Sequence, residues 1–321
     1  MGKSMHKEPF VFIGKALAKY GFGHDHPFGP DRHDAFVSLF KQQGLDHQVC
    51  IKDPVDTTRD VIERFHTQAY VQRVIDASES GQGFLDCGDT PAHKGIYDAA
   101  KTVVGTSVDA ATQIMNSNTK RAFVPIAGLH HARRDIAAGF CVFNDCGVVI
   151  ETLRQVHHVE RIAYVDIDAH HGDGVFYEFS HDPNLIFVDF HEDGRFLYPG
   201  TGAKNETGDG EAKGTKLNIP MPPGADDGTF LARWDIAESF IARFKPEFIL
   251  FQCGADSLAG DPITHMSYSE KTHAFVTNRL CRLANKYGDG RILAMGGGGY
   301  NRDNLARAWC AVVREMVTTP R

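Results

Sequence analysis

Short apolar runs alternate with longer amphipathic stretches along this chain. The apolar runs have the length of buried strands and lie at residues 10–13, 121–126, 161–166, 184–190, 247–252 and 291–295. Apolar positions with helical spacing are found at residues 30–40, 57–65, 66–76, 97–115, 146–156, 229–244, 269–287 and 302–317. Strands that alternate with helices predict an α/β fold, with a mostly parallel sheet and helices on both of its faces.

The longest stretch without either pattern is rich in glycine, proline and aspartate and covers residues 199–227. We expect it to be irregular and to form a wall of an active site rather than a boundary between domains. The chain contains no repeat, low-complexity segment or linker. The sequence therefore predicts one domain over residues 1–321.

Composition narrows the class of protein. Hydrophobic residues make up 42% of the chain and charged residues 23%, as in soluble globular proteins. The net charge of −7 argues against a broad basic surface for nucleic acid or anionic lipid, and no apolar run reaches membrane-spanning length. The seven cysteines contain no Cys-x-x-Cys pair, which is typical of reduced thiols in a cytoplasmic protein.

The end of the run at 161–166 carries four ionisable side chains within eight residues: Asp166, Asp168, His170 and Asp173. Burying a charge costs several kcal/mol unless it is paired or bound to a metal. Asp168 and His170 are two apart, so in an extended segment they project to the same side. They offer two of the three protein ligands that an open catalytic metal site needs. The alternative is a polar loop with a salt bridge.

Three further strand ends carry reactive side chains. His130 and His131 follow the run at 121–126, Asp256 follows the run at 247–252, and four glycines with Tyr300 follow the run at 291–295. In an open α/β sheet these ends gather at one edge, where sites form. Taken singly, Asp256 has the alternative interpretation of an ordinary carboxylate at a strand end, and the glycine segment that of a flexible turn.

The predicted ligands Asp168, His170 and Asp256 form an oxygen–nitrogen–oxygen set without a thiolate. Such a set suits Zn²⁺ with one open position, and it also accepts Fe²⁺, Mn²⁺ or Co²⁺.

Five segments occur in one order along the chain, and together with their surroundings from about Tyr20 to Trp309 they resemble the metal-dependent histone deacetylase family. These segments are His130-His131-Ala, Gly139-Phe-Cys-Val-Phe-Asn-Asp145, Asp166-x-Asp168-x-His170-His-Gly-Asp173-Gly, Gln252-Cys-Gly-Ala-Asp256-Ser-Leu and Gly-Gly-Gly-Gly299-Tyr300. The family includes bacterial acetoin-utilisation-type deacetylases and acetylpolyamine amidohydrolases. The resemblance implies an arginase/deacetylase-like fold.

The resemblance also implies catalytic roles. His131 is expected to act as general base and then acid, paired with Asp173, and His130 as its electrostatic partner, paired with Asp166. A carboxylate on one ring nitrogen fixes the tautomer and leaves the other nitrogen free to face a water. Tyr300 is expected to donate its hydroxyl to the developing oxyanion. A structural histidine pair with buried carboxylate partners is the alternative interpretation of the two histidines.

Five positions are expected to contact substrate by the same resemblance: Asp89, Gly139, Phe140, Tyr198 and Gly298. Phe140 and Tyr198 would line a narrow channel, or else pack into the core. Asp89 would hold the substrate backbone at the rim, or else be a solvated loop carboxylate. Glycine in this region lets the backbone approach a bound ligand closely.

A structural K⁺ or Na⁺ is implied near the divalent metal. The expected ligands are oxygens of Asp166, Asp168, His170, Asp189 and Phe190. Many relatives carry serine where this chain has Asp189. The carboxylate there would either hold the cation firmly or form a salt bridge instead.

The leading hypothesis is a zinc-dependent amidohydrolase that removes acetyl or other acyl groups from lysine side chains of proteins or peptides. One alternative is an acetylpolyamine amidohydrolase, although Gly260-Asp-Pro-Ile263 lacks the glutamate found in some polyamine-selective relatives. A catalytically silent acyl-lysine binding protein is a second alternative, and an arginase-like dimetal hydrolase is a third. We expect no nucleic-acid or membrane partner, and the sequence leaves an oligomer open.

Overall fold

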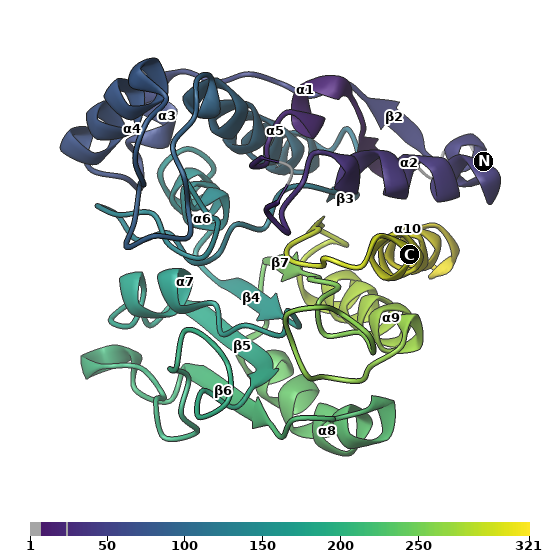
Figure 1. Ribbon diagram of the computed structural model, residues 1–321. Coiled ribbons are helices and arrows are strands. Elements are labelled where there is room, and N and C mark those ends of the chain that lie inside the picture. The colour runs from purple at the N-terminus through teal and green to yellow at the C-terminus, as the bar shows by residue number, and fades with distance from the viewer. Residues whose placement is uncertain (1–7, 24) are drawn as a thin grey trace.

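Eight parallel strands form one sheet in the part of the chain that the structure, a computed structural model, describes, namely residues 8–23 and 25–321. The strand order across the sheet is β2-β1-β3-β8-β7-β4-β5-β6. Figure 1 labels strands β2 to β7. Their bounds are β1 Phe10–Phe12, β2 Cys50–Lys52, β3 Arg121–Val124, β4 Ile162–Asp166, β5 Leu185–Glu192, β6 Lys216–Met221, β7 Phe248–Gln252 and β8 Ile292–Met295. The prediction of a parallel α/β fold is confirmed.

The six strands predicted from apolar runs are all present, and the two that the sequence did not indicate form the two edges of the sheet. β2 has three residues, too few to give a pattern. β6 lies within the stretch expected to be irregular, so that expectation is wrong for Lys216–Met221. β6 carries Pro220, which an edge strand tolerates because one side of its backbone needs no ladder partner.

The described residues also contain ten α-helices. Their bounds are α1 Lys15–Ala18, α2 Asp31–Gln42, α3 Arg59–Ile62, α4 Gln68–Ser80, α5 Ile96–Met115, α6 Asp145–Gln155, α7 Asp173–Glu178, α8 Asp227–Phe244, α9 Glu270–Tyr287 and α10 Arg302–Thr318. The helix expected at 57–65 is a single turn, α3. The short helix α7, which begins at Asp173, the last residue of the ionisable cluster, was not predicted.

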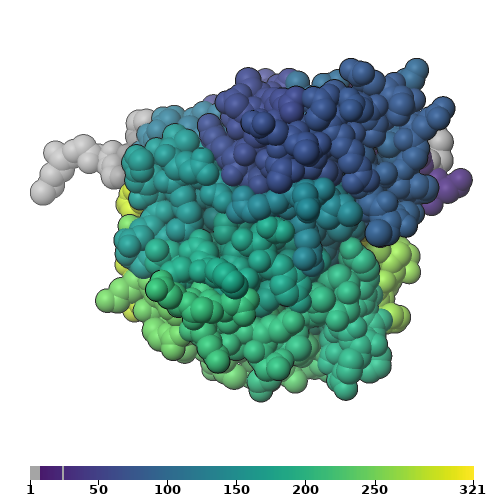
Figure 2. All heavy atoms as spheres, turned by 90° about the vertical axis from the view of Figure 1, so that its left-hand side faces the viewer, coloured from purple at the N-terminus to yellow at the C-terminus, as the bar shows by residue number. Residues whose placement is uncertain are grey.

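The helices form two layers. On one side α5 contacts α6, and on the other α10 lies between α2 and α9 while α8 contacts α9 (Figure 1). Figure 2 shows the described residues packed into one rounded body, with blue N-terminal segments directly against teal and green segments from the middle of the chain. Among the described helices, none is long and apolar enough to span a membrane.

The four central strands are buried along their whole length. In β4 and β7 every residue is buried, and Asp166 at the end of β4 pairs in register with Gln252 at the end of β7. Strands that are covered on both faces have continuous apolar sequences. These strands could therefore be predicted. Their carboxyl ends are therefore rigid platforms for the polar residues that follow.

Candidate metal centre and catalytic site

The predicted site residues follow four neighbouring strands, β3, β8, β7 and β4. His130 and His131 come after β3, Tyr300 after β8, Asp256 after β7, and the pair Asp168 and His170 after β4. β3 and β4 are separated by two strands, so the segments that follow them must bend across the sheet edge to meet. The structure brings the whole predicted set together at this edge.

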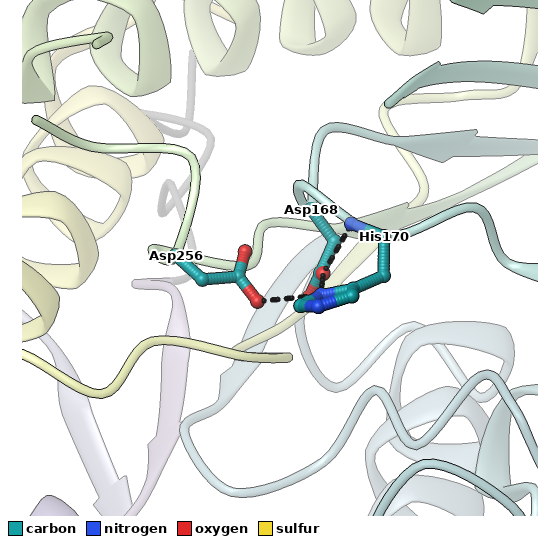
Figure 3. Close-up of side chains that lie close together, drawn as sticks. All are labelled: Asp168, His170 and Asp256. Carbon is teal, nitrogen blue, oxygen red and sulfur yellow. Dashed lines mark hydrogen bonds and ion pairs between the residues drawn. The ribbon is translucent and has the colours of Figure 1, made fainter. Parts of the chain in front are cut away.

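Asp168, His170 and Asp256 converge on one point (Figure 3). Each offers one ligand atom, and these three atoms all lie within 4.8 Å of one another. His170 Nδ1 lies 3.1 Å from Asp168 Oδ1 and 3.1 Å from Asp256 Oδ2. All three side chains are buried. This spacing suits three ligands of one divalent cation.

The electrostatics of these three residues favour positive charge between the carboxylates. Burial lowers the pKa of His170, but its hydrogen bonds to Asp168 and Asp256 outweigh burial and raise this pKa to about 10. Burial and the neighbouring Asp168 raise the pKa of Asp256 to about 7. A divalent cation would supply the positive charge that this pair of buried carboxylates stabilises. The donor set therefore fits a metal.

The remaining oxygens of the two aspartates are held by hydrogen bonds. Asp168 Oδ2 accepts from Gln252 Nε2 at 2.9 Å and from the Gly298 N–H at 2.8 Å. Asp256 Oδ1 accepts from the Ala169 N–H at 2.8 Å. Such outer contacts orient metal ligands. Gln252 was part of the recognised motif, yet the sequence assigned it no role.

Gly298 stands where no side chain fits. A Cβ there would overlap Asp256 Oδ2 and would lie 2.8 Å from Asp168 Oδ2. Gly139 is similar, because a Cβ there would overlap the ring of His131. Both glycines therefore let the backbone press against the predicted site residues.

The two histidines form two short, buried pairs with carboxylates. His130 Nδ1 lies 2.8 Å from Asp166 Oδ2, and His131 Nδ1 lies 2.7 Å from Asp173 Oδ1. Their Nε2 atoms lie 3.1 Å apart. These are the pairings that the sequence predicted.

The surroundings of the two pairs differ. Tyr164, which the sequence did not single out, donates its hydroxyl to Asp166 Oδ2 at 2.6 Å. Burial and the adjacent His130 lower the pKa of His131, so its ring is held neutral. A neutral imidazole anchored at one nitrogen accepts a proton at the other.

Tyr300 is held through its backbone. Its N–H donates to Asp261 Oδ2 at 2.8 Å. The buried Arg32 of α2 donates to the carbonyls of Gly297 at 2.6 Å and Gly299 at 2.8 Å. Burial and the nearby Asp256 raise the pKa of Tyr300 well above its usual value, so the hydroxyl keeps its proton.

A narrow cavity of about 20 Å³ lies among these groups, roughly the space of one water molecule. His130, His131, Asp168, His170 and Tyr300 all line it. A larger cavity of about 420 Å³ is lined in part by Arg121, the first residue of β3, and so lies at the amino ends of the strands. None of the predicted site residues lines it.

The two predicted channel aromatics lie on different sides of the site. The ring of Phe140 packs 5.9 Å from the ring of Tyr300, and that of Tyr198 packs 5.3 Å from His131. Tyr198 is 46% exposed, so it lies at the mouth rather than in the core. His26, which the sequence did not indicate, packs 4.4 Å from Phe140.

Asp89 lies in an exposed loop, as a rim residue should. Its backbone carbonyl lies 3.1 Å from His26 Nε2, and its Oδ1 accepts from the Thr90 hydroxyl at 3.1 Å. Burial and the neighbouring Asp86 raise the pKa of Asp89 to about 6. Asp89 is therefore linked to the Phe140 side of the mouth through His26.

Two alternatives were expected for Asp189, a bound monovalent cation or a salt bridge, and in the structure it pairs with a histidine. Its Oδ1 lies 2.7 Å from His191 Nδ1, and its Oδ2 accepts from the Gly172 N–H at 2.8 Å. Phe190, next along β5, is buried and packs 4.4 Å from Phe230.

Comparison with known proteins agrees with this geometry. Residues 26–316 match the histone deacetylase domain. The chain is 35% identical over 95% of its length to the acetoin utilization protein AcuC of Bacillus subtilis (strain 168), covering 81% of that protein. It is 33% identical over 86% of its length to a probable deacetylase of Archaeoglobus fulgidus, covering 77% of it.

A fungal relative is also similar, namely the histone deacetylase clr6 of Schizosaccharomyces pombe, with 33% identity over 94% of this chain and 75% of that one. The solved structure of the HDA15 HD domain superposes with a TM-score of 0.88, with 24% identity over 98% of this chain and 91% of that chain, which shows the shared fold. The chain belongs to the histone deacetylase family. It is a hydrolytic deacetylase.

Proposed function

We propose that this protein is a zinc-dependent deacetylase that removes acetyl or other acyl groups from lysine side chains of proteins or peptides. The observation that carries the proposal is the convergence of a three-residue ligand set, two carboxylate-bound histidines and Tyr300 on one narrow cavity. Each of these groups has a separate task in amide hydrolysis, and a structural cluster would not need all of them. A silent binding protein is disfavoured for the same reason.

Asp168, His170 and Asp256 would hold the divalent metal. When bound, the metal polarises the substrate carbonyl and lowers the pKa of a water molecule. Zn²⁺ suits the oxygen and nitrogen donors, and Fe²⁺, Mn²⁺ or Co²⁺ fit the same set. Within the described residues these three side chains form a single cluster of ligands for a metal ion, which disfavours an arginase-like dimetal site.

His131 would take the proton of the attacking water. Its Nδ1 is fixed by Asp173, and its neutral ring leaves Nε2 as the basic atom on the cavity side. The same nitrogen would then return the proton to the leaving lysine amine. His130, held by Asp166, stays beside His131 as its electrostatic partner.

Tyr300 would donate its hydroxyl to the negative charge that develops on the carbonyl oxygen. Because Arg32 and Asp261 fix its backbone, the donor is already in place before the substrate binds. Preorganised donors stabilise the transition state more than the ground state. Gly139, Phe140, Tyr198 and Gly298 would form the channel for the acyl-lysine chain.

The pairing of the other candidate acidic residues favours a lysine side chain over a free polyamine. A polycationic ligand needs unpaired carboxylates to replace its lost hydration. Glu192 is buried and binds the backbone and ring of His265, Asp193 binds Arg195, and Asp261 binds Tyr300. Asp89 remains as a rim acceptor for substrate backbone N–H groups.

The proposal is tested by turnover on three sets of substrates: acetyl-lysine peptides, longer acyl-lysine peptides and acetylated putrescine or cadaverine. We expect kcat/KM to be highest for an acyl-lysine peptide. A higher kcat/KM for acetylpolyamines would contradict the substrate class and leave the chemistry intact. Absence of turnover on all three sets, with the metal bound, would contradict the proposed function itself.

We also propose a cytoplasmic location and one catalytic domain over residues 1–321. All seven cysteines are free in the structure, as a reducing compartment requires.

A further inference from the structure

Two buried carboxylates, Asp166 and Asp189, lie on neighbouring strands against the same glycine. Both residues are 0% exposed. A Cβ on Gly172 would lie 2.9 Å from Asp166 Oδ2 and 3.4 Å from Asp189 Oδ2. Two like charges so close in a dry interior are costly, so each needs its own compensation.

Asp166 already has three hydrogen-bond partners. Its Oδ2 faces Nδ1 of His130 at 2.8 Å and the hydroxyl of Tyr164 at 2.6 Å, and its Oδ1 accepts from the Asp168 N–H at 3.0 Å. Asp189 has no such set of three partners. Apart from the Gly172 N–H, its partner is the ring of His191.

Both ring nitrogens of His191 face acceptors. Nδ1 lies 2.7 Å from Asp189 Oδ1, and Nε2 lies 2.9 Å from the Gly202 carbonyl oxygen. A carboxylate and a carbonyl have no hydrogen to give, so each ring nitrogen must carry one, and a ring with both is a cation. The other ionisable neighbours include Asp166, Asp193 and His171, whose ring lies 4.7 Å away.

This arrangement does not fit the structural K⁺ or Na⁺ that the family resemblance implies at Asp189. Both oxygens of Asp189 already accept hydrogen bonds, and the pair that it forms with His191 has no net charge. A further cation would gain little attraction there and would meet the positive ring of His191.

We propose that the His191 side chain takes the place of a structural monovalent cation beside the metal centre. As a positioning residue it holds Asp189, which fixes the Gly172 N–H next to the His130–Asp166 pair. Through Gly202 it also holds the segment that follows Tyr198. The inference rests on the proposed function only where turnover is the readout.

The first test exchanges the salt around the wild-type protein. Tm and kcat/KM are measured in KCl, NaCl and choline chloride at equal ionic strength, after dialysis against the choline salt. We expect both quantities to be the same in all three salts, since a ligand that does not bind cannot stabilise. A Tm that rises with K⁺ or Na⁺ concentration, with no such rise in choline, would overturn the inference.

The second test removes the charge. His191→Gln should leave Asp189 uncompensated, lower Tm, and make Tm and kcat/KM recover in part on addition of KCl. The matched control is His66→Gln, because His66 is also buried and its Nε2 accepts from the Asn144 N–H as a neutral ring. That control should lower Tm without any cation response. A His191→Gln variant that does not respond to KCl would count against the inference.

The two readouts separate this inference from the proposed function. Tm needs no substrate, so the salt exchange decides the inference even if no acyl-lysine is turned over. If wild-type turnover on acyl-lysine requires K⁺, the inference fails while the proposed function stands. If His191→Gln does not fold, the wild-type experiment alone decides.

Discussion

The floor of the site, which includes the ligands Asp168 and Asp256, and its rim, which includes Asp89 and Tyr198, are built differently. On the floor, Asp168 and Asp256 are almost fully buried, and each holds backbone or side-chain donors from neighbouring strands. At the rim, Asp89 lies in an exposed loop and Tyr198 is 46% exposed. The rim residues make a few local contacts each, whereas the floor residues belong to one connected network.

The difference indicates where chemistry and selectivity reside. A buried, fully hydrogen-bonded network has one arrangement and fails as a unit when one member is removed. An exposed loop residue can be replaced with little effect on the fold and tunes which substrate is held. Changes on the floor should therefore abolish turnover, and changes at the rim should shift it between substrates.

The largest expected effect follows removal of a ligand. Asp256→Ala should lose the bound metal and reduce turnover to background, because a remaining Asp–His pair is a weak site. Metal content and kcat/KM are measured on the same preparation. Asp193→Ala is the control, since Asp193 pairs with Arg195 away from the ligands and should keep both. Metal retained at the wild-type level in Asp256→Ala would contradict the claim that the floor residues hold the metal.

Loss of the hydroxyl at Tyr300 should come next. Tyr300→Phe should keep the fold and the metal and lower kcat by roughly 10²–10³-fold, the usual effect of losing one oxyanion donor. Tyr177→Phe serves as control because that hydroxyl binds Glu206 instead. Turnover near the wild-type rate in Tyr300→Phe would mean that this hydroxyl does not face the substrate carbonyl.

A smaller effect is expected when a hydrogen-bond donor to a metal ligand is removed. Gln252→Ala removes the amide that donates to Asp168 and should weaken metal affinity about 10–100-fold. Competition with a chelator of known affinity measures this change. Gln113→Ala, on helix α5, is the matched control. Unchanged affinity in Gln252→Ala would show that the network around Asp168 does not need this donor.

The floor could be predicted from the sequence because its residues directly follow buried strands. The apolar runs located β4, β7 and β8, and the ionisable groups after them needed only the rule that parallel strand ends share an edge. The role of Gln252 was not predicted, because Gln252 is the last residue of an apolar run and no sequence pattern distinguished its side chain. The role of Arg32 depends on contacts with Gly297 and Gly299, which only the tertiary fold brings near.

The surroundings of the rim were harder to predict. β6 was missed because its apolar residues alternate with Lys216, Asn218 and Pro220 and form no continuous apolar run, although the strand pairs with β5. The contact of His191 with Gly202 depends on how the loop after Tyr198 returns to the sheet. Loop paths of this kind are set by packing rather than by local pattern.

The smallest effect is expected at the rim. Asp89→Asn should lower kcat/KM for an acetyl-lysine peptide by roughly tenfold, because a charged acceptor of two backbone N–H groups becomes neutral. An acetyl-lysine analogue without flanking peptide bonds should change much less. Glu79→Gln, in helix α4, is the control. Equal losses on both substrates would assign Asp89 to the floor rather than the rim.

The most direct measurement of the central claim is a metal titration of the chelator-treated protein. Zn²⁺ is added stepwise while bound metal and turnover of an acetyl-lysine peptide are followed together. We expect no turnover without metal, and activity that rises in proportion to binding and ends at about one ion per chain. Full turnover in protein shown to be free of divalent metal would contradict that claim.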